Sequence, residues 1–186
     1  MTAPMTAATT PPVRAPGPIA GAAARLVDVT CTTTYTAEID FTGGRVLSGV
    51  HPLLTGELLA HLDAMGHSDA VVVADAHFPA ARLASRLLTF PGLSTPAVLG
   101  ALCSVLPLDD APALDLMSSA DGSRLRVQDE LITAAGAGAD DVRFLDRHEF
   151  YDVAATAYLV VRTGETRVYG NAVLRKGVVD AGGGPR

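Results

Sequence analysis

The sequence is short of positive charge. Its 186 residues include one lysine, Lys176, and the formal net charge is −6 at pH 7. A protein groove that holds a phosphate backbone needs clustered lysine and arginine side chains. The composition therefore argues against nucleic acid as a partner.

Cysteine and long apolar runs are also scarce. Cys31 and Cys103 lie far apart, and neither belongs to a Cys-x-x-Cys pair. The sequence thus predicts neither a disulfide framework nor a zinc knuckle, and it fits a reducing compartment, the cytoplasm. No stretch approaches the roughly 18 consecutive apolar residues of a membrane-spanning helix. Because 48% of the residues are still apolar, we expect one folded domain with a proper core and no membrane partner.

Composition divides the chain into three parts. The first 18 residues hold five prolines among alanine and threonine, which predicts disorder. Weak alternation over residues 26–41 is compatible with an extra hairpin. We therefore expect an N-terminal extension over 1–45, the main domain over 46–180, and a flexible glycine-rich tail over 181–186.

One stretch of the main domain combines a helix, a turn and a strand. Leu58, Leu62 and Met65 form an apolar helical stripe, for which Thr55 is the expected N-cap and Gly66 the expected left-handed stop. Residues 70–74 (AVVVA) are then typical of a strand buried on both faces. His67 precedes this strand and the carboxylate Asp75 follows it, so we interpret the stretch as a candidate site.

The rest of the main domain alternates between helical and strand patterns. This predicts an α/β fold, a three-layer-like sandwich in which helices flank a largely parallel sheet. A tight turn over residues 163–165 is expected to join the last two strands. The further helices are expected at 80–88, 95–105 (with Thr95 as the cap), 124–135 and 148–157, and the further strands at 114–117, 142–145, 158–162 and 167–174.

Polar residues cluster where the predicted strands end. Asp75 ends one strand, Asp146 and Arg147 follow another, and Tyr169-Gly170-Asn171 lies in the last. In open α/β sheets, ligands bind outside the carboxyl ends of strands. A carboxylate, a guanidinium, an amide and a phenol together suit a neutral polyhydroxylated ligand.

Five short blocks in order resemble one known family. They are Met65-Gly66-His67 with Asp69, Ala74-Asp75-Ala76-His77-Phe78-Pro79-Ala80, Arg147 with Phe150-Tyr151, Thr163-Gly164-Glu165, and Tyr169-Gly170-Asn171 with Lys176-Gly177-Val178. Over about residues 46–179 the chain is similar to the L-fucose mutarotase / D-ribose pyranase family. His-Phe-Pro and Tyr-Gly-Asn place it nearer the fucose branch. Asp115, in a strand that the family keeps apolar, and His148, where it often has an aromatic residue, depart from the family pattern.

The resemblance implies an isomerase that needs no cofactor and no metal. The α and β anomers of a deoxyhexose such as L-fucose would exchange by ring opening and closure, with protons moved by a group that titrates near neutrality. By similarity, His67 is the proton donor. Asp75, Arg147 and Tyr169-Gly170-Asn171 would bind the sugar, with Tyr151 a further contact. The family also forms closed homo-oligomers, often decameric rings, with active sites near subunit contacts.

Each of these residues has a simpler interpretation. His67 could cap the helix before it, and Asp75 could cap the turn after its strand. Arg147 could pair with a neighbouring acid at the surface, Tyr169 could be a half-buried strand aromatic, and Asn171 a bulge residue. Asp75, His77 and His67 could also form a divalent-metal site, which we consider the weaker hypothesis.

Three other functions stay open. The chain could be a D-ribose pyranase, or a monosaccharide-binding subunit that does not catalyse. It could also be a scaffold whose 26–41 segment recruits a partner.

Overall fold

The computed structural model describes residues 47–110 and 112–179. The predicted extension over 1–45, its hairpin at 26–41 and the tail at 181–186 lie outside these residues. Within them, no helix is long and apolar enough to cross a bilayer.

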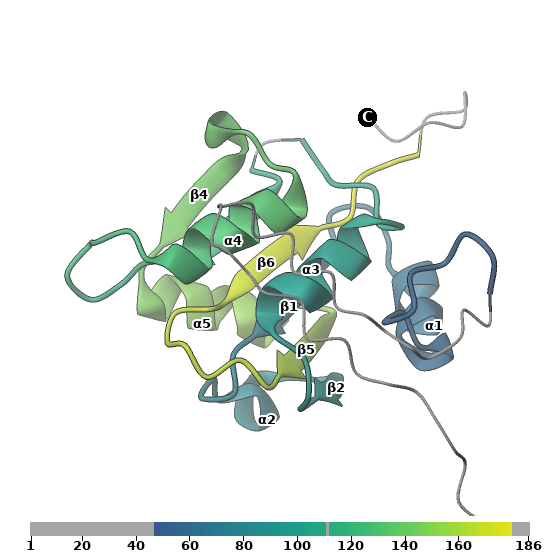
Figure 1. Cartoon of the computed structure of the whole chain (residues 1–186), viewed down its shortest axis with the longest axis horizontal. Coiled ribbons are helices and arrows are strands. Elements are labelled where there is room, and N and C mark those ends of the chain that lie inside the picture. The colour runs from purple at the N-terminus through teal and green to yellow at the C-terminus, as the bar shows by residue number, and fades with distance from the viewer. Residues whose placement is uncertain (1–46, 111, 180–186) are drawn as a thin grey trace, which may run out of the picture. The chain divides into compact units, whose positions relative to one another are not determined.

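A six-stranded sheet forms the centre of the main domain (Figure 1). Its strand order is β2-β5-β1-β6-β3-β4. Parallel pairing joins β1 to β5, β2 to β5 and β3 to β4, whereas β6 is antiparallel to both β1 and β3. The sheet is therefore largely parallel, as predicted, with β6 running against its neighbours. The strands are β1 (Ala70–Ala74), β2 (Leu87–Phe90), β3 (Leu114–Met117), β4 (Val142–Leu145), β5 (Leu159–Thr163) and β6 (Ala172–Arg175).

Helices cover both faces of the sheet. Leucines of α1, α3 and α4 pack with one face in a first apolar cluster that includes Val71 and Leu116. Phe150 of α5 and Ala80 of α2 pack with the other face in a second cluster that includes Val72. Since β1 contributes alternate side chains to both clusters, it is buried on both faces, as its unbroken apolar run predicted. The helices are α1 (Gly56–Ala64), α2 (Ala80–Leu83), α3 (Thr95–Cys103), α4 (Arg126–Ala135) and α5 (Arg147–Thr156), with a 3₁₀ turn η1 (Ala139–Asp141).

Two helix starts show the sequence rules at work. The hydroxyl of Thr55 accepts a hydrogen bond from the backbone N–H of Leu58, which confirms it as the N-cap of α1. At α3 the cap is Ser94, one residue earlier than predicted, and Pro96 stands in the first turn where no donor is needed.

Four local predictions are wrong. The strand expected over 167–174 begins only at Ala172, so Tyr169-Gly170-Asn171 lies in the loop before β6 rather than inside a strand. The helix expected over 80–88 ends at Leu83, and edge strand β2 takes its second half. The expected tight turn over 163–165 does not join β5 to β6, because β1 lies between these two strands in the sheet. Gly66 is not left-handed; the backbone instead turns left-handed at Ser68, whose φ is 64°.

The charge at Asp115 is compensated inside the fold. This side chain is fully buried, and its carboxylate receives two hydrogen bonds from Arg143, of 2.8 and 3.0 Å. Nη1 of Arg175 approaches the same carboxylate to 2.6 Å, without the alignment of a hydrogen bond. A buried carboxylate with two guanidinium partners is tolerated in a core strand, which explains how β3 keeps its place.

Candidate functional site

Asp75 and Asn171 meet where β1 ends and β6 begins. Because β6 runs antiparallel to β1, its first residues lie beside the last residues of β1. The amide oxygen of Asn171 accepts a hydrogen bond from the backbone N–H of Asp75 at 2.9 Å. The amide nitrogen of Asn171 donates to Oδ2 of Asp75 at 2.8 Å. Asn171 thus fixes both the backbone and the carboxylate of Asp75.

The Asp75 carboxylate is buried and keeps acceptor capacity. Its residue is 3% exposed, and Oδ1 accepts one hydrogen bond, from the backbone N–H of His77 at 3.0 Å. Burial raises the pKa of Asp75, while the hydrogen bonds from Asn171 and His77 oppose the rise. Each carboxylate oxygen still has a lone pair to accept a ligand hydroxyl.

Tyr169 takes a strained backbone conformation to face the same space. Its φ is 62°, in the left-handed region that non-glycine residues rarely adopt. The next residue, Gly170, is buried, and a Cβ there would lie 3.1 Å from Cγ of Glu165 and 3.2 Å from the carbonyl oxygen of Arg167. Strain of this kind persists where the surrounding structure enforces it, and it is common at functional sites.

The loop that carries Tyr169 is held at both sides. The Glu165 side chain is 5% exposed, and its carboxylate binds the guanidinium of Arg167 at 2.8 Å. Arg167 also reaches Glu130 of α4 at 2.7 Å. On the other side, Nε2 of His77 lies 3.2 Å from the carbonyl oxygen of Thr166. The loop is therefore fixed between α4 and the residues that follow β1.

Helix α5 supplies a cation and a phenol. Asp146 caps the helix by accepting hydrogen bonds from the N–H groups of His148 and Glu149, so Arg147 begins the first turn. Within the described part of the chain, Arg147 forms no ion pair, contrary to the surface-pairing alternative. Tyr151, one turn later, packs edge-on against Phe78 with ring centroids 5.5 Å apart. The helix start thus leaves a guanidinium available to a ligand.

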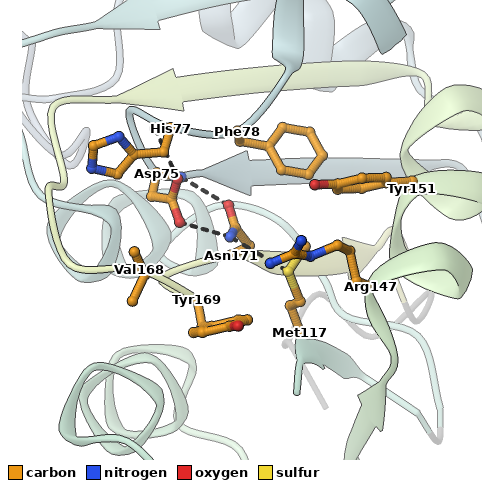
Figure 2. Close-up of a pocket in the computed structure, with 9 residues that line it drawn as sticks. All are labelled: Asp75, His77, Phe78, Met117, Arg147, Tyr151, Val168, Tyr169 and Asn171. Carbon is orange, nitrogen blue, oxygen red and sulfur yellow. Dashed lines mark hydrogen bonds between the residues drawn. The ribbon is translucent and has the colours of Figure 1, made fainter. Parts of the chain in front are cut away.

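These side chains surround one open cavity of about 230 Å³ (Figure 2). A second cavity, of about 390 Å³, adjoins it and shares Arg147 and Tyr169 as lining residues. The first cavity is lined by Asp75, His77, Phe78, Met117, Arg147, Tyr151, Val168, Tyr169 and Asn171. The structure therefore gathers most of the residues that the sequence suggested as a sugar site, with Gly170 shaping the loop behind them.

Four lining residues were not predicted as part of the sugar site: His77, Phe78, Met117 and Val168. His77 and Phe78 carried a signal, because they come within three residues of Asp75 at the same strand end. Met117 is the last residue of β3, so the strand-end argument could have found it. Val168 lies in an irregular loop, where the sequence analysis expected the strand over 167–174.

The structure does not bring His67 to this cavity. His67 is exposed and precedes β1, whereas Asp75 follows β1. Six residues of extended chain from Asp69 to Asp75 span about 20 Å at roughly 3.3 Å each. A site in which one chain places His67 beside Asp75 is therefore wrong, and so is a metal site that combines His67 with Asp75 and His77.

The cavity suits a small neutral molecule rich in hydroxyl groups. Asp75 offers acceptors, Arg147 offers donors, and the rings of Tyr169, Tyr151 and Phe78 offer apolar faces for the carbon skeleton. One carboxylate and one guanidinium balance in charge, so no net charge is required of the ligand.

Comparison with known proteins also points to a sugar ligand. The sequence model described as the RbsD / FucU transport protein family matches residues 48–179, more than half of the chain. The L-fucose mutarotase of Haemophilus influenzae is 38% identical over 141 residues, which cover 72% of this chain and 97% of that protein.

Two solved structures resemble the fold. The fucose mutarotase of Streptococcus pneumoniae, solved in complex with L-fucose, has a TM-score of 0.66 and 32% identity, covering 72% of this chain and 99% of that chain. RbsD of Bacillus subtilis, solved in complex with D-ribose, has a TM-score of 0.56 and 25% identity, covering 69% and 96%.

Proposed function

The chain belongs to the RbsD / FucU transport protein family, and we propose that it is a mutarotase that interconverts the α and β anomers of a deoxyhexose such as L-fucose. The observation that carries this proposal is the cavity in which Asp75, Asn171, Arg147 and Tyr169 face one another. The cavity holds one carboxylate and one guanidinium, and its volume of about 230 Å³ suits one neutral monosaccharide.

The reaction requires two proton transfers and no redox step. A base takes the proton of the anomeric hydroxyl, the C–O bond to the ring oxygen breaks, and an acid protonates the ring oxygen. The aldehyde then rotates and recloses on its other face, which reverses both transfers. A histidine can serve as acid and base near neutral pH, and such a group contributes roughly 10²–10⁴-fold in rate.

In this scheme the residues of the cavity bind and His67 moves the proton. The Asp75 carboxylate accepts hydrogen bonds from sugar hydroxyls, in an orientation fixed by Asn171. Arg147 donates to hydroxyl oxygens, and Tyr169 and Tyr151 cover the ring of the sugar. Removing the sugar from water in this way strengthens each hydrogen bond that holds it.

His67 then has to come from a second copy of the chain. It is exposed at one end of β1, and about 20 Å of strand separate it from Asp75 at the other end. We infer a closed homo-oligomer, such as the rings of this family, in which each copy places His67 over the cavity of its neighbour. An interface repeated by symmetry would complete every site in the same way.

Anomer exchange measured by NMR saturation transfer tests the activity. L-fucose, D-galactose and D-ribose are each examined with and without the protein. We expect faster exchange for L-fucose. Fastest exchange for D-ribose would instead favour the pyranase alternative, and no acceleration for any sugar would refute an enzymatic function.

Mixing two inactive variants tests the shared site. His67→Ala and Asp75→Asn proteins are each unable to complete a site alone, and they are unfolded and refolded together. If His67 and Asp75 come from different copies, roughly a quarter of the sites regain both groups by random assembly. If both groups acted within one chain, the mixture would stay inactive.

The same His67→Ala variant separates an enzyme from a binding subunit. An enzyme should lose most of its exchange rate, keep a small residual rate, and still bind the sugar through Asp75 and Asn171. A subunit that only binds would show no exchange in the unmodified protein. A cytoplasmic location and the 1–45, 46–180 and 181–186 division remain part of the proposal.

A further inference from the structure

The only lysine of the chain caps the helix that leads into the His67 turn. Nζ of Lys176 donates to the carbonyl oxygens of Leu62 at 2.8 Å and Met65 at 2.7 Å, and lies 3.5 Å from that of Asp63. The last carbonyl groups of a helix lack partners within the helix. One ammonium group therefore satisfies the end of α1, which the sequence analysis had assigned to Gly66 or His67.

The backbone of Lys176 also binds the turn directly. Its carbonyl oxygen accepts a hydrogen bond from the N–H of Ser68 at 2.8 Å, and its N–H donates to the carbonyl oxygen of Asp69 at 2.9 Å. His67 thus stands between α1, capped by the Lys176 side chain, and two residues that pair with the Lys176 backbone. The side chain and the backbone of Lys176 therefore hold the two sides of the His67 turn.

A second clamp comes from the segment before β3. Gly177 lets this segment approach closely, because a Cβ there would lie 2.3 Å from the carbonyl oxygen of Leu108. The N–H of Asp109 then donates to the carbonyl oxygen of Arg175 at 3.0 Å. Oδ2 of Asp109 accepts a hydrogen bond from the hydroxyl of Ser68 at 2.9 Å.

The backbone of the turn is strained at Ser68. Ser68 has a φ of 64°, in the left-handed region that a non-glycine residue adopts only at an energetic cost. Strain of this kind is commonly found at functional sites. Yet the imidazole beside it is exposed and lines neither cavity of its own chain.

We propose that Lys176 is a positioning residue for His67, with Asp109 as its second support. This inference rests on the proposed function, in which His67 acts in the site of a neighbouring copy. Lys176 fixes the backbone of the turn and thereby the orientation of the His67 side chain. A guanidinium could not replace it, because an ammonium directs its three donors to several carbonyl groups from one point, whereas arginine donates in a planar fork.

The test replaces Lys176 by methionine, which keeps the stem and removes the donors. We expect kcat for fucose anomer exchange to fall roughly 10- to 100-fold, as is typical when a catalytic group is misplaced. KM should stay within about twofold, because sugar-binding residues lie at the other end of β1. Lys176→Arg should not restore the rate.

A double variant shows whether Lys176 acts through His67. In a His67→Ala background, Lys176→Met should change the residual rate by less than about twofold, because the group it positions is gone. If Lys176→Met slows the His67→Ala protein as much as it slows the unmodified one, Lys176 has only a structural role and the proposal is refuted.

Arg86→Met is the matched control. Arg86 also binds a main-chain carbonyl, that of Tyr158, at 3.3 Å, but it does not contact the His67 turn. It should lower stability and leave kcat unchanged. No acceleration of exchange by the unmodified protein would overturn the proposed function itself. Unchanged exchange in His67→Ala would overturn the role of His67, and unchanged kcat in Lys176→Met alone would overturn only this inference. Should Lys176→Met fail to assemble, Asp109→Ala carries the same kinetic test, because it removes the acceptor of the Ser68 hydroxyl.

Discussion

Asn171 binds Asp75 at two points, through its amide oxygen to the backbone N–H and through its amide nitrogen to the carboxylate. The two residues are 96 positions apart in sequence and are both almost fully buried. The pair joins the end of β1 to the start of β6 and makes a buried carboxylate available to a ligand. The protonation state of Asp75 therefore depends on Asn171.

Replacing Asn171 by leucine should shift the pH dependence of activity. Asn171 holds the pKa of Asp75 down against burial, so its removal raises that pKa further. Sugar binding needs the ionised carboxylate, and the acid limb of the rate profile should move to higher pH. Anomer exchange measured from pH 4 upward checks this. If the acid limb did not shift, ionisation of Asp75 would not control the rate of anomer exchange.

The same variant makes a prediction about stability. Because the folded pKa of Asp75 lies above 3.8, the contribution of this group to the unfolding free energy is greatest below pH 3.8 and is lost as pH rises through the folded pKa. Asn171→Leu should enlarge that loss and cost about 1–3 kcal/mol at pH 7. Urea titrations at pH 4 and pH 7 should show the larger deficit at pH 7, and equal deficits would contradict the argument.

Tyr169→Gly should separate stability from activity. Glycine adopts a φ of 62° without strain, so thermal stability should hold or improve despite the lost side chain. Sugar affinity should fall, because the ring that lines both cavities is gone. Calorimetry and sugar titration measure the two effects. Tyr169→Phe keeps the ring and should retain most of the affinity.

Arg167→Met should loosen the loop that presents Tyr169. Arg167 lowers the pKa of Glu165, so this pair stabilises the fold above pH 4.5 and its contribution is lost as pH falls through the folded pKa. Because the guanidinium is partly exposed, we expect a cost of only about 1 kcal/mol at pH 7. Sugar binding should weaken as well, and both effects should shrink in acid. Arg124→Met removes a surface pair at Asp129 and serves as the control.

Asp115→Asn should destabilise the fold with little effect on anomer exchange. The change leaves Arg143 and Arg175 without their buried counter-charge, at a cost of about 3 kcal/mol. Asp115 is not among the residues that line the cavity. Denaturant unfolding should detect the loss while the rate per folded molecule stays within about twofold. A large loss of rate in a stable variant would mean that β3 transmits this charge to the site.

The sequence predicted what local chemistry determines. Thr55 as a cap, the apolar run of β1 and the polar strand end at Asp75 each follow from neighbouring residues. The insertion of β1 between β5 and β6 does not, because a turn signal at 163–165 says nothing about which strand pairs with which. Nor could the sequence show that Ser68, rather than Gly66, takes the left-handed conformation, since distant Lys176 and Asp109 impose it.

His67 illustrates the limit most clearly. Its motif precedes Asp75 by eight residues, and this closeness in sequence suggested closeness in space. A strand between two residues instead separates them by its whole length. His67 and Asp75 can therefore act in the same site only if they come from two different copies of the chain.

The reversed direction of β6 has a geometric consequence for such sharing. Its first residue follows Asn171 at the cavity, and its last precedes Lys176 at the His67 turn. Four residues of strand thus set the distance between the cavity and the His67 turn within one chain. In the proposed assembly, in which His67 enters the cavity of a neighbouring copy, a deletion inside β6 would shorten this distance and misalign each contact between neighbours.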